Sequence, residues 1–214
     1  MIFECEETKI DCEPLETTKS RLLASCCIRD VAKALRFLHE FSTRHGVHYQ
    51  LVDGLALGAL KWRGVLPWDI DGDIYYLINE TNVYKKHKKE FSKHGLQLKF
   101  IPKRKTYFKI INKHKFVIES WGTNMSILYG GSNHLYTRVS YDNMWLNAPY
   151  NFARWARNRY GKNCLKHTQS WQIHKFKHSF EEYPGGKFKS DAKCLSHFCL
   201  QMFPTDGNKD FYIT

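Results

Sequence analysis

Long apolar runs are absent from this chain, and so are the short signals that assign a protein to a compartment. No segment of its 214 residues approaches the roughly 18 consecutive apolar residues that span a bilayer. The N-terminus, M-I-F-E-C-E-E-T-K-I-D-C-E, is acidic and lacks the basic start and apolar middle of a signal peptide. We therefore expect no membrane span and a chain that is soluble as given. No internal repeat and no RNA- or DNA-binding motif is present either.

The C-x-x-C pairs typical of redox and zinc motifs are also missing, although the chain has seven cysteines. Three interpretations of these cysteines stay open. Disulfides such as 5–12 or 194–199 form in an oxidising compartment. Cys194 and Cys199 with His197 offer zinc ligands, but four ligands at the standard spacing are lacking. Buried or free thiols are the third interpretation, because connectivity is not determined by sequence.

Composition indicates one folded domain with a basic surface. Hydrophobic residues make up 43% of the chain and aromatic residues 15%, which supplies a core and excludes disorder for the body of the chain. The formal net charge is +12, and much of it lies between Lys85 and Lys115. A basic surface attracts phosphates of any kind. We interpret it first as a solvated face, second as attraction for a nucleotide or an anionic glycan, and third as nucleic-acid binding, so no specific nucleic acid is expected.

Hydrophobic periodicity predicts a mixed α/β fold, with helices and strands following one another. Helices are expected at 18–44, 54–62, 79–94, 151–160 and 191–203, and strands at 47–52, 73–78, 96–101, 107–112, 116–121 and 135–141. Gly46 and Gly95 lie just beyond two of these helices, where glycine commonly ends a helix. We divide the chain into a lead-in (1–16), a domain (17–162) and a C-terminal extension (163–214) packed on the same domain.

Three aspartates, Asp69, Asp71 and Asp73, stand at alternate positions after a glycine-containing turn. If residues 71–77 form a strand, side chains two apart share one face. Like charges that close repel each other unless a cation lies between them. Carboxylate oxygens are the ligands that suit Mg²⁺ or Mn²⁺ carrying a substrate phosphate. The alternative is a solvated acidic turn.

The stretch at 54–74 resembles the LicD/fukutin family of phosphotransferases. The family signature is roughly G-T-L-L-G-A-x-R-x-G-x-x-I-P-W-D-D-D-I-D-hydrophobic, and this chain follows it without a gap. The matching residues are Gly54, Leu57, Gly58, Ala59, Pro67, Trp68, Asp69, Asp71, Asp73 and Ile74. A second similarity begins at Ala148-Pro149-Tyr150 and ends in an Arg-Tyr-Gly sequence. The resemblance covers about residues 20–162.

This resemblance implies a nucleotidyltransferase-like mixed sheet flanked by helices. Family members move a phospho-alcohol group, such as phosphocholine or ribitol phosphate, from a CDP-activated donor onto a glycan or glycoprotein. It implies a Mg²⁺ or Mn²⁺ site at Asp69, Asp71 and Asp73, the last two also being catalytic. It also implies work in the Golgi or secretory pathway, while the residues themselves assign no compartment.

The same resemblance implies further site residues. Glu119, in F-V-I-E-S-W, matches a third acidic residue on a neighbouring strand that completes the metal site or acts as general base; an exposed strand glutamate is the alternative. Substrate contacts are expected at Gly54, Gly58, Lys61 and Lys109. A glycine at a strand-to-helix turn lets backbone N–H groups approach a phosphate, although a plain tight turn and a solvated Lys109 are the simpler interpretations.

Four departures from the signature matter for the chemistry. Leu55 replaces a Thr or Ser, which removes a hydroxyl that would contact phosphate. Lys61 replaces an Arg and loses its bidentate geometry. Ile70 and Gly72 replace an Asp and an Ile, so the acidic run is thinner. These departures leave a second hypothesis open: a catalytically weak or inactive relative that binds a nucleotide or glycan.

Overall fold

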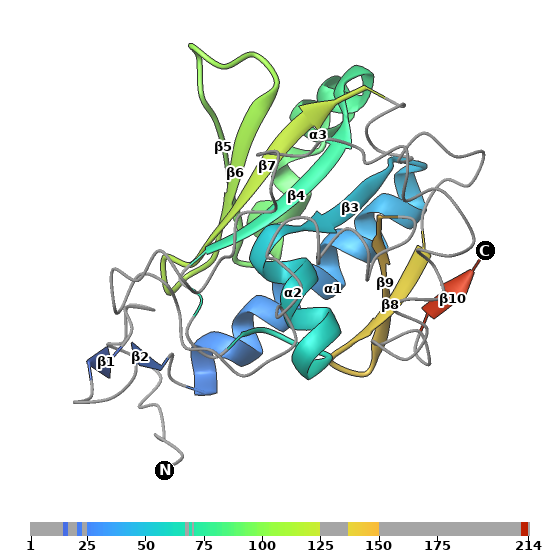
Figure 1. The fold of residues 1–214 in the computed structure, drawn as a ribbon. Helices are drawn as coiled ribbons and strands as arrows, with labels where there is room; N and C mark the ends of the chain where they lie inside the picture. Colours follow the sequence, from blue (N-terminus) through green and yellow to red (C-terminus); the bar gives the residue numbers. More distant parts are fainter. Residues whose placement is uncertain are drawn as a thin grey trace, which may run out of the picture.

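The structure, a computed structural model, describes residues 15–16, 21–22, 25–66, 69, 71–124, 137–149 and 211–213 (Figure 1). Its centre is a five-stranded mixed sheet in the order β3-β4-β7-β6-β5. These strands are β3 (Tyr49–Val52), β4 (Asp71–Leu77), β7 (Val117–Thr123), β6 (Tyr107–Ile111) and β5 (Gln97–Phe100). The central strands β4 and β7 are parallel and the other neighbours are antiparallel. The expected mixed α/β fold is therefore confirmed.

Helices cover one face of this sheet through an aromatic core. They are α1 (Ser25–His45), α3 (Thr81–Lys86) and α4 (Lys88–Lys93), the last two following a short 3-10 turn, η1 (Ile78–Glu80). The Phe41 ring of α1 lies 5.4 Å from that of Tyr84 and 4.8 Å from that of Phe91. Tyr84 in turn packs 5.3 Å from Tyr76 and 4.8 Å from Phe108 on the sheet. All five rings are fully buried, so the side chains that alternate with them on the strands face away from these helices.

A second sheet lies beside β3 and has the order β10-β8-β9 (Figure 1). Its strands are β8 (Thr137–Tyr141), β9 (Met144–Ala148) and β10 (Phe211–Ile213). Asp142 and Asn143 join β8 to β9 with φ values of 47° and 58°, which is the pattern of a type I′ hairpin turn. The sequence analysis predicted β8 and missed β9, even though Asp-Asn is a residue pair that this turn favours.

Most predicted elements are present, and two helices need correction. Helix α1 ends before Gly46 (φ 61°) as predicted, but it begins at Ser25 rather than Thr18. The reason is that β2 (Arg21–Leu22) pairs with β1 (Leu15–Glu16), so the helix begins only after this strand pair. The predicted helix at 79–94 is broken at His87 into α3 and α4.

Two predicted helices and most of the cysteines lie outside the described residues. The helices expected at 151–160 and 191–203 and the cysteines at 5, 12, 164, 194 and 199 lie outside the described residues. Cys26 and Cys27, at the start of α1, are buried and disulfide-bonded. No described helix is both long enough and apolar enough to cross a membrane.

Two of the departures from the family signature meet in space. Gly72 lies on the buried face of β4, and a Cβ there would be 2.8 Å from Cδ1 and 2.9 Å from Cγ of Leu55. Leu55 belongs to α2 (Asp53–Trp62) and is 2% exposed. The larger side chain at position 55 therefore fills the space that a side chain at position 72 would take. The two departures therefore compensate each other in volume, which keeps α2 packed on β4.

This contact predicts energetic coupling between the two positions. Gly72→Ala overpacks the contact and should cost about 1–3 kcal/mol of unfolding free energy. Leu55→Ala leaves a cavity and should cost about 2–5 kcal/mol. The double variant should be less destabilised than the sum by about 1 kcal/mol or more, measured by urea denaturation. As a control, Val139→Ala on β8 should add to Gly72→Ala without coupling; additivity of both pairs would contradict the contact.

Candidate metal and phosphate site

The parallel pairing of β4 with β7 brings predicted site residues onto one face of the sheet. Asp73 lies directly opposite Glu119, and Asp71 points the same way two residues earlier. On the other side of β7, Lys109 of β6 is opposite Glu119. All four side chains are partly buried, whereas Gly72 between the aspartates is buried against the helix side. The structure thus brings Asp71, Asp73, Glu119 and Lys109 together.

Asp73 is held by one hydrogen bond and surrounded by like charges. The indole Nε1 of Trp121 donates to its Oδ1 at 3.0 Å. Burial raises the pKa of Asp73 to about 7; the charges of Asp53, Asp71 and Glu119 add to this effect, and the Trp121 bond opposes it. A carboxylate with so high a pKa is one that lacks a compensating positive charge.

The pKa of Asp71 is raised as well, by the same kinds of interaction. Burial is the main cause that raises its pKa, followed by the charge of Glu119, while the Lys109 ammonium acts in the opposite direction. Asp53 contributes repulsion here as well. The two aspartates therefore resist simultaneous ionisation, and a cation bound between them would relieve that repulsion.

Glu119 is already paired. Its Oε1 lies 2.9 Å from Nζ of Lys109. Burial alone would raise the pKa of Glu119, but hydrogen bonds from Lys109 and Tyr107 outweigh burial and hold the pKa below its ordinary value. The same contact raises the pKa of Lys109. Glu119 is consequently an ionised carboxylate at neutral pH, with Lys109 as its counter-charge.

Asp69 precedes β4, and its carboxylate lies against the first turn of α2. A Cβ on Gly54 would overlap the Asp69 carboxylate, so the glycine leaves room for that carboxylate. The Asp69 backbone N–H donates to the Leu66 carbonyl at 3.1 Å. Its charge acts on Tyr141 of β8, whose pKa is raised first by burial and then by Asp69. An acidic group beside a helix N-terminus is favoured by the helix dipole, which accounts for this position of Asp69.

Two residues at the site were missed by the sequence analysis. Asp53 begins α2 with φ 46°, and its charge acts on both Asp71 and Asp73. An Asp directly before Gly54 at a strand-to-helix turn was a signal, because Asp tolerates a left-handed backbone. Trp121 follows Glu119 by two positions, so strand alternation placed it on the same face.

The remaining predicted residues have other positions. Gly58 lies near the C-terminal end of α2, where a Cβ would overlap the carbonyl of Gly64, and the Gly64 N–H donates to the Gly58 carbonyl at 3.3 Å. The close approach of the turn that follows α2 leaves no room for a side chain at Gly58. The side chain of Lys61 lies outside the described residues.

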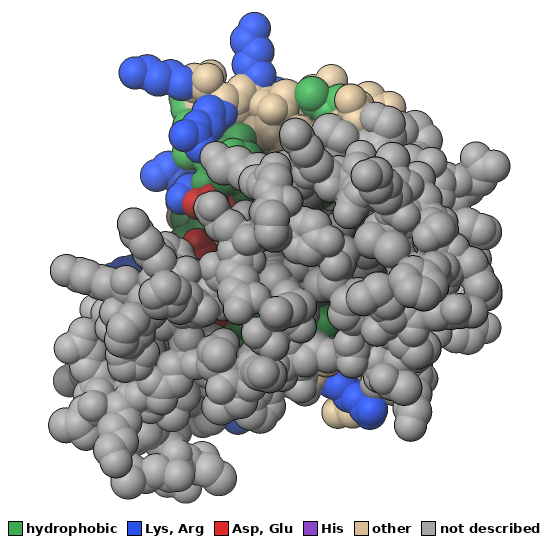
Figure 2. Space-filling model, viewed as in Figure 1, with side chains coloured by type: hydrophobic (Ala, Val, Ile, Leu, Met, Phe, Trp, Pro, Cys, Tyr) green, Lys and Arg blue, Asp and Glu red, His purple; other side chains and the backbone are tan. Residues whose placement is uncertain are grey.

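Basic and aromatic groups border the carboxylates. The guanidinium of Arg104, in the turn between β5 and β6, lies 5.3 Å from the Tyr107 ring and 5.7 Å from the Trp121 ring. Those rings are 4.4 Å apart. Figure 2 shows acidic side chains directly beside basic ones on this part of the described surface. Positive charge next to a carboxylate pair is the arrangement that a metal-bound phosphate ligand requires.

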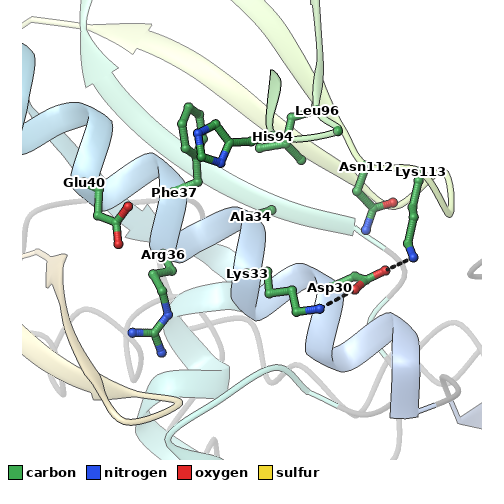
Figure 3. Close-up of a pocket in the computed structure, with 11 residues that line it drawn as sticks. Asp30, Lys33, Ala34, Arg36, Phe37, Glu40, His94, Leu96, Asn112 and Lys113 are labelled. Carbon is green, nitrogen blue, oxygen red and sulfur yellow. Dashed lines mark ion pairs between the residues drawn. The ribbon is translucent and has the colours of Figure 1, made fainter. Parts of the chain in front are cut away.

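A separate cavity of about 390 Å³ lies on the helix side of the molecule. Figure 3 shows it between α1 and the turns that carry His94 and Lys113, with Asp30 paired to both Lys33 and Lys113 at 3.7 Å. None of the predicted site residues lines it. The carboxylate site is therefore a surface of the sheet and not part of this cavity.

Comparison with known proteins finds only distant structural similarity. No family model and no curated protein matches the chain. Among solved structures, a lincosamide antibiotic adenylyltransferase bound to lincomycin is 14% identical, with a TM-score of 0.40, covering 57% of this chain and 82% of that one. A tRNA-processing enzyme in an apo form is 12% identical, with a TM-score of 0.35, covering 68% of this chain and 37% of that one. Likeness at this level identifies no shared ligand or reaction.

The raised pKa of Asp73 predicts a pH-dependent stability. The folded protein holds a proton on Asp73 up to a pH of about 7, whereas the ordinary value is 3.8, so the unfolding free energy should fall as pH rises between these values. Asp73→Asn removes this titration. Without divalent metal, the difference in unfolding free energy between the variant and the parent should grow in favour of the variant as pH rises from about 4 to about 8. The expected growth is up to about 4 kcal/mol. Urea denaturation with a chelator measures the difference.

The control for this experiment is Glu40→Gln, which removes an exposed carboxylate from α1. Because Asp73 is unchanged in this variant, its unfolding free energy should fall between about pH 4 and about pH 7 as in the parent. Parallel curves for Asp73→Asn and the parent would contradict the assignment of the titration to Asp73.

The Trp121 hydrogen bond predicts a positioning role. Trp121→Phe keeps the aromatic contact with Tyr107 but removes the only indole donor to Asp73 that the described residues show. Loss of a bond that orients a metal ligand should weaken Mn²⁺ binding roughly 10- to 100-fold in calorimetry. Trp145→Phe, at an exposed tryptophan of β9, serves as the matched control. Equal Mn²⁺ affinity in the two variants would remove this role from Trp121.

Proposed function

We propose that this chain is a metal-dependent phosphotransferase that moves a phospho-alcohol group, of the ribitol phosphate or phosphocholine type, from a CDP-activated donor to a glycan hydroxyl. The observation that carries the proposal is the pair of like-charged aspartates beside Glu119, with the pKa of Asp73 raised to about 7. A site of this kind gains stability when a cation binds. The resemblance of the same residues to the LicD/fukutin signature supplies the donor and acceptor classes.

Asp71 and Asp73 fit Mg²⁺ or Mn²⁺, because both offer hard oxygen ligands on one face of a strand. Asp53 adds negative charge at the same place, and Asp69 stays a predicted ligand from the signature. When bound, the ion neutralises the donor diphosphate and stabilises the leaving nucleotide.

The protein groups supply binding and proton transfer. Lys109 and Arg104 offer positive charge for the donor phosphates. The acceptor oxygen forms a bond to the distal phosphorus, the bond from that phosphorus to the bridging oxygen breaks, and CMP leaves with the electron pair. The hydroxyl proton passes to Glu119, which is ionised at neutral pH and would exchange its Lys109 bond for one to the acceptor.

A second candidate is a non-catalytic relative that binds nucleotide or glycan. The observation that favours it is Leu55, whose side chain is buried against the Gly72 position, so position 55 offers no hydroxyl to a phosphate. The salt bridge between Lys109 and Glu119 favours it as well, because it occupies the proposed base.

An oxidising compartment fits this proposal. Cys26 and Cys27 are disulfide-bonded, and disulfides persist in the secretory pathway. Work in the Golgi, as the family resemblance implies, agrees with this chemistry.

The enzyme hypothesis predicts that Asp71→Asn and Asp73→Asn each abolish metal-dependent release of CMP from a panel of CDP-activated alcohols. Each variant removes one negative ligand from the metal site, while the fold stays intact. Loss of at least about 100-fold is expected for such ligands. Glu40→Gln should keep parental turnover. Full activity in either aspartate variant would exclude the assignment.

Calorimetry with Mn²⁺ and CDP, run beside the turnover assay, separates the two candidates. Binding of CDP that needs both Mn²⁺ and Asp73, together with CMP release, supports the transferase. The same binding without CMP release for any donor supports the non-catalytic relative.

A further inference from the structure

On the helix side of the sheet, two histidines and a glutamate converge at the break between α3 and α4. Nε2 of His45 lies 3.0 Å from Oε1 of Glu90, and Nδ1 of His87 lies 2.8 Å from the same oxygen. The ligand atoms of the three residues all lie within 4.8 Å of one another. Among the described residues, the sheet carboxylates form no such compact group, so this convergence is separate from the proposed active site.

Packing fixes the orientation of the two imidazoles. Their ring centroids are 4.0 Å apart, and the buried Phe41 lies 4.5 Å from His45 and 6.1 Å from His87. The cluster itself is partly exposed, with 20% of the His45 side chain, 26% of His87 and 32% of Glu90 accessible. The residues are therefore held in place by the core and still reachable from solvent.

We propose that His45, His87 and Glu90 form a zinc site that ties the end of α1 to the break between α3 and α4. Imidazole nitrogen and carboxylate oxygen are common zinc ligands, and three protein ligands with a water molecule complete a tetrahedron. Zn–N and Zn–O distances of about 2.0–2.2 Å place neighbouring ligand atoms about 3.3 Å apart in a tetrahedron. The observed separations of 2.8 and 3.0 Å need only a small expansion.

The second carboxylate oxygen of Glu90 has its own partner. Nη2 of Arg44 lies 3.2 Å from Oε2, which is also 3.2 Å from Nε2 of His45. A hydrogen bond of this kind orients a ligating carboxylate in metal sites. Zinc binding replaces the protons that the two imidazoles now direct at Glu90, and each neutral ring then carries its proton on the other nitrogen.

The proposed zinc site also explains why the helix is broken at His87. His87 ends α3 and precedes α4 with φ −99° and ψ 17°, and the backbone N–H of Glu90 donates to the His87 carbonyl at 2.9 Å. This turn brings the side chains of His87 and Glu90 together at i and i+3, facing His45. A bound ion would link three helices whose common core is Phe41, Tyr84 and Phe91.

The test is titration of the metal-free protein with Zn²⁺ by calorimetry. Parent protein should bind one Zn²⁺ at this site, and His87→Gln and Glu90→Gln should each weaken binding at least about 100-fold. The matched control is His48→Gln: His48 Nδ1 pairs with Oε1 of Glu80 at 2.6 Å, and the described part of the chain adds no third ligand to this pair. His48→Gln should bind Zn²⁺ like the parent.

Co²⁺ substitution of the parent protein identifies the ligands even if a variant fails to fold. A site of two imidazoles and a carboxylate gives two hyperfine-shifted imidazole N–H signals and no thiolate-to-metal charge-transfer band. A thiolate band, unchanged Zn²⁺ affinity in His87→Gln and Glu90→Gln, or no Zn²⁺ binding beyond that of a variant carrying both substitutions would overturn the proposal. The cluster would then be an ion-pair network only.

Discussion

Repulsion among carboxylates gathered by the parallel pairing of β4 and β7 is the constraint on which the candidate site depends. The pairing sets Asp73 beside Glu119, and strand alternation adds Asp71 to the same face. Among the described residues the compensation is only partial, because Lys109 neutralises Glu119 and leaves the two aspartates with raised pKa values. The fold therefore holds a local excess of negative charge, which a divalent ion with its phosphate ligand would offset.

That charge is tolerable because the opposite face of the same strands is apolar. Tyr76 and Phe108 of the sheet, packed on Tyr84 of α3, are fully buried and supply the hydrophobic free energy that keeps the sheet intact. The contact of Leu55 with the Gly72 position holds α2 against the strand that carries the aspartates. A residue between the two aspartates thus serves packing, while the aspartates serve the site, and the alternation of β4 keeps the two tasks separate.

Local patterns predicted the elements, and non-local register decided the site. Alternation placed Asp71 and Asp73 on one face, and Gly46 marked the end of α1. The Trp121 bond to Asp73 and the Lys109 pair with Glu119 depend on how β7 aligns with β4 and β6, which no single strand encodes. Asp69 continues the alternate pattern but precedes β4, and its carboxylate lies against Gly54, so its role as a ligand stays a prediction.

The two proposed metal sites differ in ligand chemistry as well as in location. On the sheet face the ligands are carboxylate oxygens, which suit Mg²⁺ and Mn²⁺, whereas at His45, His87 and Glu90 the imidazoles favour Zn²⁺. Selectivity follows from ligand type and geometry, because raw affinity alone would favour zinc at both places. The compact imidazole cluster would bind scarce zinc first. The carboxylates are more widely spaced and also need a phosphate ligand to complete the coordination of an ion. They would therefore remain available to the abundant hard cations.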